Sequence, residues 1–190
     1  MNVHTWIEND LQSIRAKLDD SVRSVIPTQR WVEQVDDGGS SVAHLLLHLA
    51  RHQDLAVATA IRDHPPLFAE QRSALGLSDA ESHAGLSERE DPSVTARVSL
   101  DALVVYVDAV FDATKTWLGR VDTEFLDTMP DTARRLEDKA DLSTQDVGWL
   151  HRMWSDKPVW WLVQWPIIGH GHAHVGEAIS VRNRMGLSPF

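Results

Sequence analysis

Apolar residues recur at steps of three to four positions in four long stretches of the chain, a spacing that predicts amphipathic helices. These stretches run from residue 3 to about 25, from 40 to about 62, from 99 to about 121 and from 158 to 185. No internal repeat is visible, and no stretch alternates in the way that indicates a sheet. The pattern predicts an all-α fold, and four long helices most simply form a four-helix bundle.

The helix ends carry recognisable signals. The expected N-caps are Ser40 or Ser41 for the second helix, Ser99 or Asp101 for the third, and Ser155 or Asp156 for the fourth. Gly186 is suited to the position just after the fourth helix. Pro166 lies in the middle of that helix and is expected to kink it or start it afresh, and Gly169 and Gly171 weaken it further.

Two long polar connectors separate the later helices. The first covers residues 63–98 and is rich in Ser, Glu, Asp and Gly; the second covers 122–157, with a short helix expected near 131–139. A loop as long as the first is unusual unless it is functional or crosses the molecule. The whole chain, residues 1–190, has the length of one domain.

Composition narrows the function classes. Hydrophobic residues make up 43% of the chain, which indicates a globular fold, and the formal net charge of −10 argues against nucleic acid or an anionic membrane as the partner. The longest apolar run, 159–168, is too short to span a membrane, and no targeting signal is visible, so a cytoplasmic protein is expected. The chain has no cysteine, so any thiol chemistry needs a small-molecule thiol.

Three histidines and a glutamate lie close together in the fourth helix. His170 and His174 are four residues apart, so they stack on one face, and Glu177 follows on the same stripe. His172 points about 200° away from His170 and is expected on the outer face. Two histidines one turn apart can offer two nitrogen ligands to one metal ion.

The second helix has a similar stripe, formed by His44, His48 and His52. A bundle could bring one of them against the His170/His174 pair. The result would be a three-nitrogen site with an open position, which is typical of catalytic rather than structural metal sites.

The two histidine segments carry a family resemblance. Residues 41–52 (SVAHLLLHLARH) resemble the second-helix motif of the DinB/YfiT-like superfamily, and residues 170–187, with H-x-x-x-H and then Gly-Glu, resemble its C-terminal motif. The resemblance implies a four-helix bundle among metalloenzymes that are often dimeric. Known relatives use low-molecular-weight thiols, as in mycothiol-dependent maleylpyruvate isomerase and bacillithiol- or glutathione-type S-transferases.

Carried over position by position, the resemblance implies the ligands His48, His170 and His174. The expected metal is a divalent ion, Zn or Ni, which lowers the pKa of a bound water or thiol or polarises a carbonyl. The expected co-substrate is a low-molecular-weight thiol such as mycothiol. Glu177 is then a partner of a ligand or a general base, and Asp54 is a weaker catalytic candidate.

Other interpretations stay open. Metal-dependent hydrolysis, or a non-catalytic helical dimer that binds a metal or small ligand, would use the same residues. Packing, or contact with a metal ligand, is the favoured role of His44 and His52. Core packing is the favoured role of the tryptophans before the histidine pair, which could also line a substrate pocket. The residues expected at the surface or in loops are His4, His64, His83 and His151. The fourth helix is apolar on both sides, which favours a homodimer.

Overall fold

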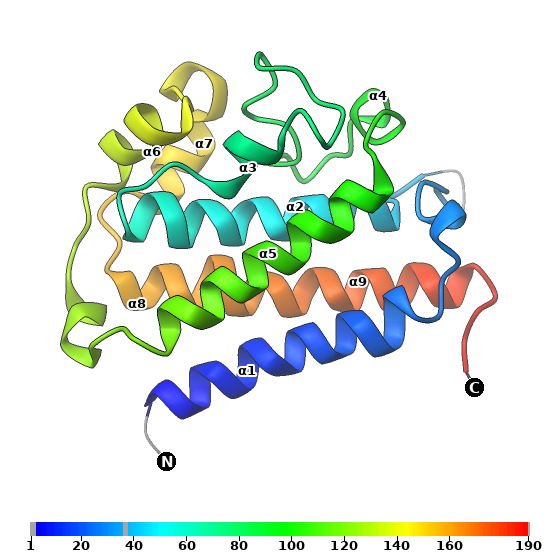
Figure 1. Cartoon of the computed structure of the whole chain (residues 1–190), viewed down its shortest axis with the longest axis horizontal. Coiled ribbons are helices and arrows are strands. Elements are labelled where there is room, and N and C mark those ends of the chain that lie inside the picture. The colour runs from blue at the N-terminus through cyan, green and yellow to red at the C-terminus, as the bar shows by residue number, and fades with distance from the viewer. Residues whose placement is uncertain (1–2, 36–37, 190) are drawn as a thin grey trace.

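The computed structural model describes residues 3–35 and 38–189, and within these ranges every regular element is helical. Four long helical segments are present. The first is α1 (Val3–Leu18), which ends in the π-helical turn η1 (Asp19–Arg23), and the second is α2 (Val42–Asp54), which continues into the π-helical η3 (Leu55–Ile61). The third is α5 (Leu100–Leu118), and the fourth runs from α8 (Val159–Leu162) through the π-helical η5 (Val163–Gly169) into α9 (His170–Arg184). In Figure 1, α2 and the α8–α9 segment run alongside each other, α5 crosses them obliquely, and α1 lies below. The prediction of an all-α fold with four long helical segments is confirmed, and most boundaries fall within a few residues of those expected.

Helix α2 is the central element. It packs against α5 and α9, and α1 packs against α5 and α9 as well (Figure 1). All 13 residues of α2 are buried, including every polar one. Among the helices described, none combines the length and the apolar character that crossing a bilayer would require.

The connectors hold more structure than their polar composition predicts. They contain α3 (Leu67–Gln71), α4 (Pro92–Thr95), the 3₁₀ helix η4 (Thr123–Asp127), α6 (Thr132–Ala140) and α7 (Thr144–Trp154), and a further 3₁₀ turn, η2 (Thr28–Arg30), precedes α2. The short helix expected near 131–139 is α6, whereas α7 was not predicted. These segments cover the core with isolated apolar side chains such as Phe68, Leu86 and Trp154, each buried.

The caps agree with the sequence for two helices. The hydroxyls of Ser41 and Ser99 accept hydrogen bonds from backbone N–H groups in the first turns of α2 and α5. The expected cap of the last helix by Ser155 or Asp156 is wrong. The N-cap residue is Pro158, because Ser155 still ends α7 and Asp156 turns the chain with a left-handed φ of 56°.

Pro166 does not start the last helix afresh, because the helical backbone continues through it. It lies inside η5, where the backbone changes to π-helical spacing before α9 begins at His170. Proline has no backbone N–H to donate, and the wider spacing of a π-helical stretch accommodates the missing hydrogen bond. The helix therefore stays continuous into the histidine pair.

Gly171 lies at a close approach of α9 to α1. A Cβ atom there would lie 3.1 Å from Ile14 Cδ1 and 3.3 Å from Ile14 Cγ2, whereas a Cβ at Gly176 in the same helix would have no neighbour within 4 Å. We expect Gly171→Val to lower the free energy of unfolding by about 1–3 kcal/mol, because the added volume forces the helices apart.

The matched variant Gly176→Val should change stability by less than about 0.5 kcal/mol. Urea unfolding of both variants beside the wild type measures the difference. Equal stability of the two variants would contradict the close contact between α1 and α9.

Candidate metal centre

A column of imidazoles runs along α2. The ring centroids of His44 and His48 are 5.6 Å apart, and those of His48 and His52 are 4.6 Å apart. All three side chains are buried. The four-residue spacing places them on the face that α2 turns toward α9.

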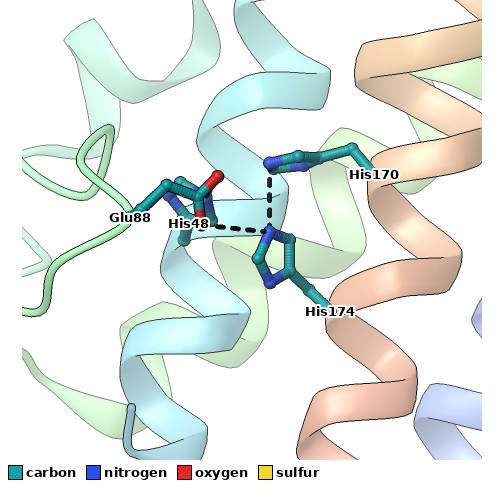
Figure 2. Close-up of side chains that lie close together, drawn as sticks. All are labelled: His48, Glu88, His170 and His174. Carbon is teal, nitrogen blue, oxygen red and sulfur yellow. Dashed lines mark hydrogen bonds and ion pairs between the residues drawn. The ribbon is translucent and has the colours of Figure 1, made fainter. Parts of the chain in front are cut away.

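His170 and His174 of α9 meet this column at His48, and His170 also contacts His52, with ring centroids 4.4 Å apart. Their Nε2 atoms lie 3.1 Å from each other, and the His48 ring centroid lies 4.8 Å from that of His170 and 4.6 Å from that of His174. Figure 2 shows the three rings converging from two neighbouring helices. The structure thus brings together the three histidines that the family resemblance implies as ligands.

Glu88 joins the three histidines from the first connector. Its Oε1 lies 3.7 Å from His48 Nε2, and its Oε2 lies 4.0 Å from His174 Nε2 (Figure 2). One potential ligand atom from each of the four residues lies within 4.8 Å of the others, a group that could hold a metal ion. No pattern in the sequence distinguishes Glu88, because it is one of many acids in a non-periodic stretch.

Hydrogen bonds fix which imidazole nitrogens are free to bind. His48 Nδ1 donates to the Gly85 carbonyl at 2.8 Å, and His174 Nδ1 donates to Glu177 Oε2 at 3.1 Å. In both rings the lone pair is therefore on Nε2, which faces the cluster. His52 is the reverse case: its Nε2 donates to the Leu86 carbonyl at 3.1 Å.

Burial favours the neutral form of four of the imidazoles, those of His44, His48, His52 and His170. Desolvation, with a smaller contribution from neighbouring imidazoles, lowers the pKa of His48 to about 2. Burial is also the main cause that lowers the pKa of His52 to about 4 and that lowers the pKa values of His44 and His170. Neutral imidazole is the form that binds a metal ion.

The donor set could hold a metal ion. The nitrogen ligands of a tetrahedral zinc site lie about 3.3 Å apart, because each Zn–N distance is 2.0–2.1 Å. His170 Nε2 and His174 Nε2 are 3.1 Å apart and share a hydrogen bond, in which His170 Nε2 donates because the His174 proton is on Nδ1; a metal ion between them would replace this bond. His48 Nε2 is buried and has no hydrogen-bond partner among the described residues. A buried lone pair without a partner is costly, and a cation would satisfy it.

The two predicted catalytic carboxylates lie in different places. Glu177 contacts His174, as expected of a partner of a ligand. Asp54 is not in the cluster: it accepts hydrogen bonds from the backbone N–H groups of Leu67 and Phe68 and from the Tyr106 hydroxyl. This buried carboxylate ties α3 and α5 to α2, which is a structural role.

Several histidines and tryptophans depart from expectation. His151 is buried, with Nε2 2.8 Å from the Leu142 carbonyl, so its assignment to the surface is wrong. His172 is not simply on the outer face, because it turns toward α1 and lies 3.5 Å from Asp10. Core packing is wrong for Trp160 and Trp165, which are 48% and 42% exposed.

A cavity of about 440 Å³ adjoins His44, at the end of the imidazole column, and none of the four cluster residues lines it. Its lining includes His44, Gly85, Ser87 and Arg89. The Nε2 atom of His44 is buried without a hydrogen-bond partner within the described part of the chain. A larger cavity of about 750 Å³ lies between α1 and α5, away from the histidines, so the converging imidazoles rather than cavity size identify the site.

Comparisons with known proteins support the fold. No protein-family model matches the chain, and no curated protein matches it. Among solved structures, the chain is similar to one described as the crystal structure of the conserved protein of locus from Enterococcus faecalis, with a TM-score of 0.69 and 20% sequence identity over 98% of this chain and 99% of that one. At this identity the likeness shows the fold alone.

The buried imidazoles predict that the metal-free protein is sensitive to acid. Unfolded histidine has a pKa near 6.5, whereas His52 and His48 stay neutral in the fold down to about pH 4 and about pH 2. The unfolded state therefore binds more protons below pH 6.5. The free energy of unfolding should fall by about 1.4 kcal/mol per pH unit for each such histidine.

Urea midpoints of metal-free protein between pH 7 and pH 4.5 measure this slope. The control is His52→Gln, whose amide can still donate to the Leu86 carbonyl but does not titrate, so its midpoint should fall less steeply. Parallel slopes for the wild type and the variant would show that His52 is protonated in the fold.

Proposed function

We propose that the protein is a metal-dependent enzyme of the DinB/YfiT-like kind, with His48, His170 and His174 as the metal ligands. The observation that carries the proposal is the convergence of three buried imidazoles, two of which present Nε2 lone pairs because Nδ1 donates elsewhere. The all-helical fold is in keeping with it. Open three-histidine sites are typical of catalysis.

The residues around the cluster have separate tasks. A Zn²⁺ or Ni²⁺ ion held there would lower the pKa of a bound thiol or water, or polarise a carbonyl. Glu177 orients His174 and is the nearest carboxylate of α9 to that ligand. The backbone carbonyl of Gly85 orients His48.

The proposed reaction is transfer or isomerisation that depends on a low-molecular-weight thiol of the mycothiol type. The chain has no cysteine, so it cannot supply the thiol itself. The cavity of about 440 Å³ beside His44 is large enough for a small molecule. Hydrolysis, with water in place of the thiol, is the second candidate, because the same cluster would serve it.

We also propose that two chains form a homodimer. Trp6 and Trp160 are 54% and 48% exposed, and both line one apolar hollow of about 180 Å³ together with Val3. Large exposed indoles in one patch are typical of an interface.

Trp160→Glu should therefore shift the mass in solution from two chains to one, measured by light scattering. Val105→Glu, at a 61% exposed position on α5, is the matched control and should leave the mass unchanged. A monomeric wild type would contradict the dimer.

Metal content tests the site itself. Elemental analysis of untagged wild-type protein should find about one divalent ion per chain, and His174→Ala should lose it because two nitrogens then remain. His172→Ala is the matched control two residues away, since His172 turns toward Asp10 and not toward the cluster. Absence of metal from the wild type, or metal retained in His174→Ala, would overturn the ligand assignment.

Turnover then separates the two reactions. If the protein is a thiol transferase, the rate at which it consumes an electrophilic substrate should depend on added mycothiol-type thiol. Equal turnover with and without thiol would favour the hydrolase.

A further inference from the structure

Glu88 combines an exposed side chain with an inward-facing carboxylate. The side chain is 74% exposed, yet its two oxygens lie 3.7 Å from His48 Nε2 and 4.0 Å from His174 Nε2. Within residues 3–35 and 38–189, these two imidazoles are the only partners of that carboxylate. Figure 2 shows it reaching over the cluster from a loop.

The loop on either side of Glu88 is firmly attached to α2. On one side, the carbonyls of Gly85 and Leu86 accept hydrogen bonds from His48 and His52. On the other side, Glu90 accepts hydrogen bonds from Ser41 N–H at 2.6 Å and from Ser41 Oγ at 2.9 Å. Glu88 therefore stands on a short span between two anchors, and its own side chain is the part that can move freely.

Gly85 shows how closely the loop lies on the helix. Its φ is +76°, and a Cβ atom there would lie 2.7 Å from Leu47 Cγ. Only glycine combines that backbone conformation with that approach. The position from which Glu88 reaches the cluster is thus set by backbone contacts and not by chance rotation of a free loop.

The Glu88 carboxylate would compensate part of the charge of a bound metal ion. Three neutral imidazoles leave both positive charges of a divalent ion uncompensated, and an unbalanced buried charge is costly. One carboxylate removes half of that charge. Because Glu88 stays largely in water, contact with the cluster costs it little hydration, and it regains that hydration when it swings outward.

We propose that Glu88 is a fourth, displaceable metal ligand, and that the protein's substrate or co-substrate is an anion that takes its place. This inference rests on the proposed metal site. It also specifies the ligand class: a singly charged donor such as a thiolate or carboxylate restores the same charge balance after Glu88 swings outward. A neutral ligand would lose that balance and bind more weakly.

Azide, a small anionic metal ligand, tests the exchange on Co²⁺-loaded protein, whose visible spectrum reports the ligand set. Glu88→Ala should bind azide more tightly than the wild type, because no internal carboxylate competes. The gain is about tenfold if Glu88 fills the position nine-tenths of the time. The Co²⁺ spectrum of the azide-free variant should also differ from that of the wild type.

Two controls separate coordination from a general charge effect. Asp79→Asn removes one negative charge from the same connector at a fully exposed position paired with Arg72, and should leave azide affinity unchanged. Glu88→Asp keeps the charge but shortens the reach, and should resemble Glu88→Ala.

The outcomes are distinct. Tighter azide binding in both Glu88 variants, with Asp79→Asn like the wild type, supports the proposal. Bound metal with the same azide affinity in all four proteins would overturn the role of Glu88 while leaving the metal site in place. A wild-type protein that binds no Co²⁺ would overturn the proposed function and this inference together.

Discussion

The burial of a polar-rich helix is the constraint on which the rest of the structure depends. Every residue of α2 is buried, although the helix carries three histidines, an arginine, a glutamine and an aspartate. Each buried polar group left without a partner costs about 1–3 kcal/mol. The first connector supplies many of the partners: its carbonyls accept from His48, His52 and Arg51, and its N–H groups donate to Asp54. The long loop is therefore required by the helix it covers.

The same hydrogen bonds decide what the histidines can do. His48 and His52 both bond to neighbouring carbonyls of the loop, but His48 uses Nδ1 and His52 uses Nε2. Only His48 is left with an Nε2 lone pair directed at α9. Burial keeps both rings neutral, so the metal-binding form exists in the fold without any need for alkaline conditions. Stability and the chemistry of the site thus have one origin.

Periodic features could be predicted from the sequence, and tertiary ones could not. The i, i+4 spacing of His170 and His174 and of the α2 histidines identified both stripes, since helical geometry is local. The choice of His48 over His44 and His52 came from a family resemblance and not from spacing. The structure supplies the physical reason, which is the position of the Gly85 carbonyl. The sequence did not predict where Asp54 and His151 lie. Asp54 binds Tyr106 through packing between distant segments, and His151 binds the Leu142 carbonyl at a turn that has no periodic signal.

Glu88 shows most clearly which site residues the sequence could not predict. The length of the connector at 63–98 indicated a functional or crossing segment, but nothing distinguished Glu88 from its acidic neighbours. Glu81 pairs with Arg97 and Glu90 binds Ser41, so both are used to hold the loop. Glu88 alone of these three turns to the imidazoles. Glu88 becomes a candidate ligand because neighbouring acids make the contacts that hold the loop, so its own carboxylate is free to face the imidazoles. Which acid holds the loop and which one faces the cluster depends on the folded backbone and not on the local sequence.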